Sequence, residues 1–356
     1  MAAAIPTEPV HFLVAGPLDQ QTGGYRYDRR VIGGLESVGL AVNVHELAGR
    51  FPDPDAAARG SVADALAMVA TGGLAVIDSL CLAAADSAME HGADRVRVVA
   101  LVHHPASRET GLPLKVAHRL AEAERATLGA AARVIATSEH TAGILATEYG
   151  VPRAAIGVVA PGVDPAPLAA GSGEGALTLL TVGSVVPRKG HRGLLRALAP
   201  LRHLDWRLEC HGSLSRHRAN AAAVKSLVAR LGLGDRVRLR GETGDDVLAA
   251  AYHGADLFVL ASHYEGYGMV IDEALARGLP VVASAGGAVP EIAPEDATLL
   301  VPPGDVAALS EALGRAIGEP SLRATLAAGA RRRRRELRGW HVSVDRFRSE
   351  LVKVAK

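Results

Sequence analysis

Cysteine is nearly absent from this sequence of 356 residues, and aromatic residues make up only 3% of it. The two cysteines, Cys81 and Cys210, lie far apart along the chain, which argues against a disulfide framework or a structural zinc site. We therefore expect a reducing compartment, the cytoplasm. Because aromatic side chains are scarce, the core must be built from Ala, Val and Leu. Such a core favours helices layered on parallel strands over a β-sandwich.

A strong net charge and long apolar runs are also lacking. Lys plus Arg number 39 against 38 for Asp plus Glu, so the composition gives no reason to expect a nucleic-acid partner. No apolar run approaches the ~20 residues that span a bilayer. Met1–Pro6 has no basic start followed by an apolar core, and we do not expect a signal peptide there. The arginine run Arg331–Arg335 indicates a solvated helix face or, alternatively, weak peripheral contact with anionic lipid at the inner face of the membrane.

Apolar stretches of strand length alternate with amphipathic helical patterns along almost the whole chain, which predicts parallel sheets buried on both faces. One segment, Pro161–Gly175, is rich in Pro and Gly and has the composition of a linker. We predict an α/β fold with two doubly wound, Rossmann-like domains, residues 1–165 and 175–335, which face each other across a cleft. A further helix in 336–356 could pack back on the first domain. The expected strands are Val10–Ala15, Ala41–Val44, Leu74–Asp78, Val96–Val102, Val134–Thr137, Gly157–Ala160, Leu177–Val182, Trp206–His211, Val237–Arg240, Leu257–Leu260, Val281–Ala283 and Thr298–Val301.

The segment from Glu265 to Glu273 is the most informative part of the sequence. Its two carboxylates are separated by a turn that contains Gly266 and Gly268, and a helix is expected from Met269 to Arg277. A helix N-terminus attracts phosphate, glycine lets the backbone approach a ligand, and a carboxylate accepts hydrogen bonds from sugar hydroxyls. This arrangement suits a nucleotide sugar, which carries hydroxyls at both ends and phosphate in the middle. The predicted donor-binding residues of the segment are Glu265, Gly266, Tyr267, Gly268, Met269, Val270 and Glu273.

A second phosphate-binding candidate follows the strand Leu177–Val182. The strand ends at Gly183, and Arg188 and Lys189 come shortly after it. Arg supplies a planar fork of donors and Lys a mobile charge, so the pair could clamp a diphosphate at the crevice between the domains. The alternative is an ordinary exposed basic turn.

Two weaker glycine signals occur elsewhere in the second domain. The backbone at Gly241 and Glu242 could meet the edge of a base, although turn chemistry explains this pattern equally well. Gly286 and Gly287 follow another expected strand and favour close approach of a ligand to the backbone.

The first domain offers Gly23 and Gly24, which follow the first expected strand and precede a helix expected from Tyr27 to Gly39. Their N–H groups could face phosphate or an acceptor across the cleft. No G-x-G-x-x-G motif follows that strand, which argues against a nicotinamide-dependent oxidoreductase.

The strand Val96–Val102 ends at His103 and His104. Histidines at the carboxyl end of a strand are better placed for a site than for a core, and we predict that His103 contacts the sugar. Purely structural roles for both histidines are the alternative. Zinc would need a third ligand, and none is obvious in the neighbouring sequence, so no metal is predicted.

Together these motifs resemble the retaining GT-B glycosyltransferases of family 4, also called glycosyltransferase group 1. Tyr267 departs from the Phe that is commoner in that family, a change that should be tolerated. The residues that carry the resemblance are Val182-Gly183 with Arg188 to His191, Glu265 to Gly268 with Glu273 to Ala276, Gly278 to Val282, Gly286-Gly287 with Pro290-Glu291, and Pro161 to Asp164.

The resemblance implies transfer of a hexosyl group, with retention, from a UDP- or GDP-linked sugar to a hydroxyl of a glycan, a lipid-linked or a small-molecule acceptor. It implies that Glu273 holds the ribose and Glu265 faces the hexose. Arg188 and Lys189 would neutralise the diphosphate, so neither a metal nor a cofactor is expected. The predicted catalytic residues are Glu265, His103, Arg188 and Lys189. A nucleotide-sugar 2-epimerase and a non-catalytic nucleotide-sugar-binding protein remain the alternatives.

Overall fold

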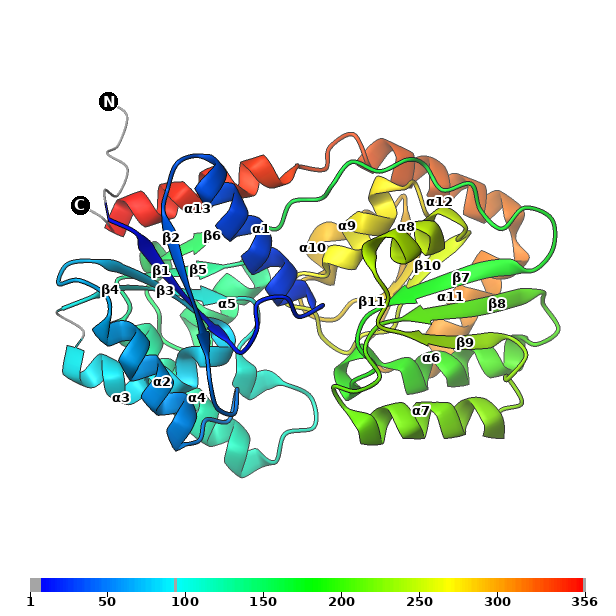
Figure 1. The fold of residues 1–356 in the computed structure, drawn as a ribbon. Helices are drawn as coiled ribbons and strands as arrows, with labels where there is room; N and C mark the ends of the chain where they lie inside the picture. Colours follow the sequence, from blue (N-terminus) through cyan, green and yellow to red (C-terminus); the bar gives the residue numbers. More distant parts are fainter. Residues whose placement is uncertain (1–7, 93–94, 355–356) are drawn as a thin grey trace. The chain divides into compact units, whose positions relative to one another are not determined.

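The computed structural model describes residues 8–92 and 95–354 (Figure 1). Contacts within the chain divide it into two units. Unit 1 runs up to Gly162 and also includes the helix from Trp340, and unit 2 is Val163–Gly339. The segment Met1–Pro6 and the last two residues of the expected C-terminal helix lie outside the described residues.

Unit 1 contains a six-stranded parallel sheet in the order β2-β1-β3-β4-β5-β6. The order reverses at β1, and ligands of doubly wound sheets bind beyond the carboxyl ends of the strands near such a reversal. The strands are β1 (Val10–Ala15), β2 (Val42–Leu47), β3 (Leu74–Asp78), β4 (Arg97–Val102), β5 (Arg133–Ala136) and β6 (Ile156–Val158). The helices are α1 (Gly23–Ser37), α2 (Ala56–Ala67), α3 (Leu82–Gly92), α4 (Leu114–Ala130), α5 (Glu139–Glu148) and α13 (Trp340–Val354), with short 3₁₀ turns η1 (Ser79–Cys81), η2 (Ala106–Arg108) and η3 (Arg153–Ala155).

Unit 2 contains a second six-stranded parallel sheet, in the order β12-β11-β10-β7-β8-β9. Its order reverses at β7. The strands are β7 (Leu177–Val182), β8 (Trp206–His211), β9 (Val237–Gly241), β10 (Leu257–Leu260), β11 (Val281–Ser284) and β12 (Thr298–Val301). The helices are α6 (His191–Leu198), α7 (Arg218–Arg230), α8 (Asp245–His253), α9 (Met269–Ala276), α10 (Val289–Ile292), α11 (Val306–Gly318) and α12 (Pro320–Arg333), with 3₁₀ turns η4 (Pro187–Lys189) and η5 (Ala199–Leu201).

Inner strands such as β4, β7 and β10 are mainly apolar because helices cover both faces of each sheet. Consecutive strand residues point to opposite faces. In β7, Leu179 joins one apolar cluster, which includes Leu194 of α6 and Val224 of α7. Its neighbour Leu180 joins another, which includes Ile271 of α9. A strand buried on both sides has no polar face, and this is the pattern that the sequence shows.

The predicted α/β fold is confirmed, and each expected strand range overlaps an observed strand. The ends differ most where polar residues continue a strand. The strand expected over Ala41–Val44 runs instead from Val42 to Leu47 as β2, which lies at the edge of its sheet and is largely exposed. An edge strand tolerates polar side chains such as His45, so its apolar pattern ends before the strand does.

The first helix begins earlier than the sequence pattern predicts. It was expected from Tyr27, but α1 starts at Gly23, so Gly23 and Gly24 form its first turn rather than a loop before it. Thr22 precedes the helix in an extended conformation, and its carbonyl accepts the N–H of Arg26 at 2.9 Å. The glycine N–H groups therefore belong to a helix N-terminus, where backbone donors have no partner within the helix.

The C-terminal helix α13 packs on α1 within unit 1, where the two helices lie side by side (Figure 1). A Cβ on Gly34 of α1 would lie 2.2 Å from the side chain of Val344, so glycine is needed there for the helices to approach. The guanidinium of Arg133 lies 2.6 Å from the carboxylate of Glu350 and ties the same helix to the end of the sheet.

The arginine run lies at the end of α12 and just beyond it, and several of its side chains contact unit 2 itself. Arg332 lies 2.6 Å from Asp296, Arg333 lies 3.0 Å from Glu336, and Arg334 donates to the carbonyl of Ala166 at 2.6 Å. These contacts favour the interpretation of a solvated helix face.

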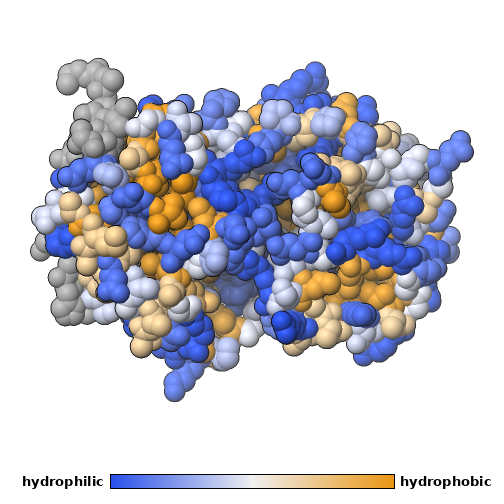
Figure 2. All heavy atoms as spheres, in the orientation of Figure 1, coloured by the Kyte–Doolittle hydropathy of each residue, from blue (hydrophilic) through white to orange (hydrophobic). Residues whose placement is uncertain are grey.

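Large hydrophobic side chains that are exposed are scattered, and the face of the molecule in Figure 2 carries separate apolar areas among hydrophilic ones. Within residues 8–92 and 95–354, none of the helices has the length and apolar character required to cross a bilayer. The exposed large hydrophobic residues are Val38, Val44, Met68, Leu114, Leu168 and Val247.

Candidate functional site

The candidate site of unit 2 lies beyond the carboxyl ends of β7 and β10. The segment after β7 carries Gly183, Arg188 and Lys189, and the segment after β10 carries Glu265. These strands are neighbours in the sheet, so parallel pairing brings both segments to one edge. The N–H of His263 donates to the carbonyl of Arg188 at 2.7 Å and joins the two segments through their backbones.

A buried ion cluster forms where these segments meet. The ammonium of Lys189 lies 2.6 Å from Oε1 of Glu265, and the guanidinium of Arg188 lies 3.5 Å from Oε2. Arg188 also donates to the carbonyl of Tyr264 at 2.8 Å. Glu265 is only 6% exposed. Burial alone would raise the pKa of its carboxyl group, but the charges of Lys189 and Arg188 hold that pKa below the usual value.

Glycines create the room for this cluster. Gly183 has φ +153°, and a Cβ there would lie 3.2 Å from the side chain of Lys189. Gly190 has φ +67°, and a Cβ there would lie 1.9 Å from the carbonyl oxygen of Ala261. A larger residue at position 190 would push the segment after β7 away from the segment after β10, and one at position 183 would displace the side chain of Lys189.

Gly286 and Gly287 pack against the protein's own backbone, and the close approach of a ligand to them stays a prediction. A Cβ on Gly287 would lie 2.1 Å from the carbonyl oxygen of Glu265, and one on Gly286 would lie 2.4 Å from that of His263. The N–H of Ala288 donates to the carbonyl of Glu265 at 2.9 Å. The close approach at these glycines is therefore made by the protein's own backbone, which fixes Glu265 in place.

Helix α9 carries the second carboxylate. Gly268, in the left-handed region at φ +101°, precedes the helix, so Met269 and Val270 lie in its first turn and Glu273 in the next. The hydroxyl of Tyr252, on α8, donates to Oε2 of Glu273 at 2.9 Å. This hydrogen bond orients the carboxylate of the half-buried Glu273, and no sequence motif pointed to Tyr252.

Tyr252 is itself tightly packed. It is 1% exposed, it stacks on Phe258 with ring centroids 5.9 Å apart, and the guanidinium of Arg277 lies 4.4 Å from its ring centroid. Arg277 also donates to the backbone carbonyl of Glu273 at 2.9 Å. The helical periodicity of apolar residues predicts that Tyr252 lies on the core side of α8, but nothing in the sequence indicates that its hydroxyl binds Glu273.

Tyr267, which replaces the commoner Phe, has a specific partner. Its hydroxyl donates to the carboxylate of Asp272 at 2.7 Å, within the turn and helix that join Glu265 to Glu273. Burial raises the pKa of Asp272 to about 6. The hydroxyl that distinguishes Tyr267 from Phe therefore makes an internal hydrogen bond.

The ends of β7, β8 and β9 are linked by backbone hydrogen bonds. The N–H of Gly183 donates to the carbonyl of His211 at 2.8 Å, and the N–H of Gly212 donates to the carbonyl of Gly241 at 2.8 Å. Glu242 follows directly and is exposed. Gly183 and Gly241 thus lie at one edge of the sheet, and the contact with a nucleotide base stays a prediction.

In unit 1 the structure brings Gly24 and His103 together. A Cβ on Gly24 would lie 3.2 Å from Cδ2 of His103, so the first turn of α1 leaves just enough room for the imidazole ring. His103 lies at the carboxyl end of β4, beside the end of β3. Gly23 precedes Gly24 at the start of α1, whose N-terminus therefore lies at the same edge of the sheet.

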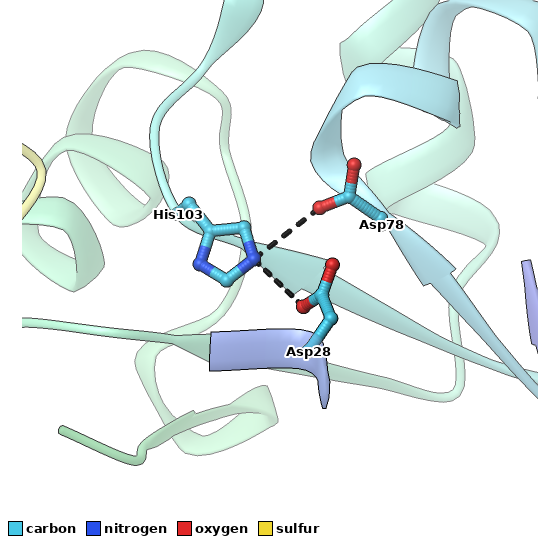
Figure 3. A group of neighbouring side chains, drawn as sticks. All are labelled: Asp28, Asp78 and His103. Carbon is cyan, nitrogen blue, oxygen red and sulfur yellow. Dashed lines mark hydrogen bonds and ion pairs between the residues drawn. The ribbon is translucent and has the colours of Figure 1, made fainter. Parts of the chain in front are cut away.

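Two buried carboxylates lie beside the same nitrogen of the His103 ring (Figure 3). Its Nε2 lies 3.0 Å from Oδ1 of Asp28, on α1, and 3.3 Å from Oδ2 of Asp78, the last residue of β3. Burial alone would lower the pKa of His103, but the charges and hydrogen bonds of Asp28 and Asp78 raise it to about 10. Burial raises the pKa of Asp28 to about 6.

Nε2 of His103 and one carboxylate oxygen each of Asp28 and Asp78 lie within 4.8 Å of one another. An imidazole nitrogen and two carboxylates are groups that a divalent cation can also accept, although the sequence around His103 offers no such partners. The carboxylates come from residues far from His103 in sequence. The position of Asp78 at the end of an expected strand could have marked it as a site residue. Asp28 could have been noticed because it is an acidic residue on the apolar face of its helix.

Comparisons with known proteins agree with the motifs. The family model "Glycosyl transferases group 1" matches residues 169–333, and "Glycosyltransferase Family 4" matches residues 40–167. A D-inositol 3-phosphate glycosyltransferase of Thermomonospora curvata is 34% identical over 276 residues, 71% of this chain and 63% of that protein. An MMP alpha-(1->4)-mannosyltransferase of Mycolicibacterium hassiacum is 30% identical over 258 residues, 68% of this chain and 62% of that protein. The chain belongs to glycosyltransferase family 4.

The matched region spans less than two thirds of the length of these two relatives, at 63% and 62%. Solved structures with a similar fold include sucrose-phosphate synthase from Thermosynechococcus elongatus, with a TM-score of 0.82 and 22% identity over 97% of this chain and 98% of that one. Anabaena HepE in complex with UDP and glucose has a TM-score of 0.74 and 18% identity over 96% of this chain and 98% of that one. These structures identify the fold as GT-B.

Proposed function

We propose that this protein is a retaining hexosyltransferase that moves a sugar from a UDP- or GDP-linked donor to an acceptor hydroxyl without a metal ion. The observation that carries the proposal is the cluster of Lys189, Arg188 and Glu265 at the carboxyl ends of β7 and β10. Glu273 follows in the second turn of α9. Family membership supports the chemistry, and the cluster supplies residues for it.

Arg188 and Lys189 would bind the diphosphate. They carry two positive charges against the single negative charge of Glu265, so the cluster retains one unit of positive charge for an anionic ligand. Charge grows on the diphosphate as the bond to the sugar breaks, and fixed cations in a site of low dielectric stabilise it there. Each well-placed donor of this kind contributes about 3–4 kcal/mol.

The two carboxylates would bind the two ends of the donor. Glu273, oriented by the hydroxyl of Tyr252, would accept hydrogen bonds from the ribose hydroxyls. Glu265, which is kept ionised by its two cations, would face the hexose. The backbone at Gly266, together with the first turn of α9, would approach the diphosphate and the sugar.

Resemblance to the family supports retention at the anomeric carbon. The acceptor hydroxyl would attack from the face that the diphosphate leaves, and a departing phosphate oxygen would take the acceptor proton. His103 in unit 1 would contact a hydroxyl of the sugar through the ring nitrogen that faces away from Asp28 and Asp78 (Figure 3).

The first experiment is a thermal-shift screen with UDP-, GDP- and ADP-linked sugars, because a ligand that binds the folded state raises its stability with the logarithm of its concentration. Transfer is then assayed with the donor that binds. Inositol phosphate is a sensible first acceptor, because several relatives carry the name D-inositol 3-phosphate glycosyltransferase.

The assay separates the alternatives. Release of the nucleoside diphosphate with formation of a glycoside supports the proposal. Inversion at C2 of the sugar without an acceptor would identify an epimerase, and tight binding without turnover of any donor would identify a binding protein. Either of the last two outcomes overturns the proposal.

A further inference from the structure

We infer that Asp28 and Asp78 are positioning residues that hold His103 as an imidazolium, so that its Nδ1–H is a permanent donor to a substrate oxygen and His103 does not act as a base. The inference rests on the proposed function for the identity of that oxygen. The state of the ring itself follows from the geometry of unit 1.

The contacts fix which nitrogen of the ring carries a proton. Both carboxylates approach the same nitrogen, Nε2, at 3.0 and 3.3 Å, while Nδ1 is on the other side of the ring (Figure 3). An ionised carboxylate only accepts hydrogen bonds, so Nε2 must be the donor to both. A neutral ring in that tautomer would leave Nδ1 as an acceptor, whereas an imidazolium has a donor there.

Burial decides between these two states. Asp28 is 1% exposed and Asp78 is 3% exposed, and two buried negative charges a few ångströms apart repel each other strongly. Asp78 also accepts local hydrogen bonds: its Oδ1 accepts the N–H of Leu80 at 2.9 Å, and its Oδ2 accepts the hydroxyl of Ser79 at 3.3 Å. A protonated His103 supplies the opposite charge that the pair needs.

Two neighbouring groups carry no charge that could balance the cluster, because burial raises the pKa values of the Tyr27 hydroxyl and the Cys81 thiol and both stay neutral. Arg29 does contribute a positive charge near Asp28, but it lowers the pKa of Asp28 less than His103 does. Its guanidinium donates to the carbonyls of Leu18 and Gln20 at 2.6 and 2.9 Å. The direction of the His103 pKa, raised to about 10, agrees with an imidazolium.

The ring is also fixed in orientation. Tyr27 packs edge-on against it with ring centroids 5.1 Å apart, and the hydroxyl of Tyr27 donates to the carbonyl of Val159 at 2.9 Å. Gly24 packs against another side of the ring, since a Cβ on Gly24 would lie 3.2 Å from Cδ2 of His103. A donor held in this way loses little conformational entropy when it binds an oxygen.

A protonated ring limits what His103 can do in the reaction. An imidazolium has no lone pair, so His103 cannot take the proton of the acceptor hydroxyl at neutral pH. It can donate to a hydroxyl or phosphate oxygen, and that hydrogen bond is strengthened by its charge. The acceptor proton must therefore leave with another group, such as the departing phosphate.

The test measures the ring directly and needs no substrate. Protein labelled with ¹⁵N-histidine is titrated by long-range ¹H–¹⁵N correlation spectra, with His103→Gln to assign the signal. We expect both nitrogens of His103 to stay protonated from about pH 6 to about pH 9, whereas an ordinary histidine loses a proton near about 6.5. Loss of a ring proton near neutral pH overturns the inference.

The variant Asp28→Asn tests the positioning role. Removal of an adjacent opposite charge should lower the midpoint of the His103 titration by about 1–3 units, because such a charge shifts a pKa by that amount. Asp64→Asn, at an exposed position of α2, is the matched control and should leave the midpoint unchanged. If Asp28→Asn does not fold, Asp78→Asn repeats the test. The titration of the unsubstituted protein tests the state of His103 even if neither variant folds.

A metal ion is the rival occupant of this cluster. If Zn²⁺ or Mn²⁺ added to the protein removes the His103 ring proton and binds with one-to-one stoichiometry in calorimetry, the cluster is a metal site and the inference is wrong. Unchanged His103 signals in the presence of either ion support it.

A transfer assay links the ring to function. His103→Gln should lower kcat/KM by about 10–100-fold, as loss of a charged hydrogen bond does. Adding Asp28→Asn to His103→Gln should lower kcat/KM little further. In the protein that keeps His103, Asp28→Asn should make the rate fall as the pH rises through the lowered midpoint of the His103 titration. Full additivity of the two substitutions contradicts the inference. Failure to find any transfer would count against the proposed function, and the titration would still decide the state of His103.

Discussion

The ammonium of Lys189 lies 2.6 Å from the carboxylate of Glu265, although 76 positions separate the two residues in sequence. Each belongs to a motif that the sequence analysis assigned a role by itself, one for the diphosphate and one for the hexose. The contact joins these roles, because the same charge that would bind the diphosphate keeps Glu265 ionised while it is buried.

Replacing Lys189 with alanine should therefore damage both catalysis and stability. The substitution leaves buried Glu265 with only Arg188, at 3.5 Å, to balance its charge. Breaking one side of a buried pair costs about 3–5 kcal/mol, and the remaining arginine should reduce that to about 1–3 kcal/mol in urea unfolding. Transfer should fall by two orders of magnitude or more, by roughly 10²–10³-fold.

Lys225→Ala is the control for Lys189→Ala, because Lys225 is exposed on α7. It should leave stability and transfer near those of the unsubstituted protein. If Lys189→Ala retained normal turnover with the true donor, the cluster would not be the diphosphate site.

Tyr252→Phe should act on donor binding through Glu273. The substitution removes the 2.9 Å hydrogen bond that orients the Glu273 carboxylate and keeps the ring between Phe258 and Arg277. One hydrogen bond contributes about 0.5–1.5 kcal/mol, so the KM for the donor should rise about 2–10-fold while kcat changes less.

Initial-rate kinetics with both substrates varied provides an internal control for Tyr252→Phe. The KM for the acceptor should not change, and Glu273→Gln should raise the KM for the donor further than Tyr252→Phe does. An equal effect of Tyr252→Phe on both KM values would indicate a general loss of packing instead.

His191 should make the protein less stable in mild acid. Burial, with the charge of Lys189, lowers the pKa of His191 in the folded state to about 4, below the usual 6.5. Between these values the unfolded chain binds the proton and the folded chain does not, so stability is full above about 6.5 and falls as the pH falls towards about 4. The loss is on the order of 3 kcal/mol at most.

Urea unfolding at about pH 7 and about pH 5, within the window given by the pKa of His191, measures this effect. His191→Gln should lose less stability between the two conditions than the unsubstituted protein. An equal loss in both proteins would assign the acid sensitivity to other groups. Asp272 has the opposite sign, because its raised pKa of about 6 favours the folded state as the pH falls.

The strands and the donor motifs could be predicted because their signals are local. An apolar run such as Leu257–Leu260 is buried on both faces of the sheet, so the run of apolar residues alone predicts the strand. The pattern around Gly268, in which an acidic residue and a glycine turn precede a helix, is likewise confined to a few consecutive residues.

Contacts between distant elements could not be predicted in this way. Asp28 and Asp78 lie on α1 and β3, and only the strand order brings them to His103. The hydrogen bond from Tyr252 to Glu273 likewise depends on how α8 packs beside α9. The early start of α1 was missed because glycine has a low helix propensity, which matters less in a first turn.

Transfer should not require a divalent metal ion. Arg188 and Lys189 place two cations at the candidate diphosphate position, and such cations do the electrostatic work that Mg²⁺ does in other enzymes of phosphate chemistry. Initial rates with the true donor should be the same after dialysis against EDTA and after addition of Mg²⁺. The control is Arg188→Ala, in which one cation is lost and added Mg²⁺ could restore part of the rate. A strict requirement for Mg²⁺ in the unsubstituted protein would show that these two residues are not enough to bind the diphosphate, and the assignment of the donor site would have to change.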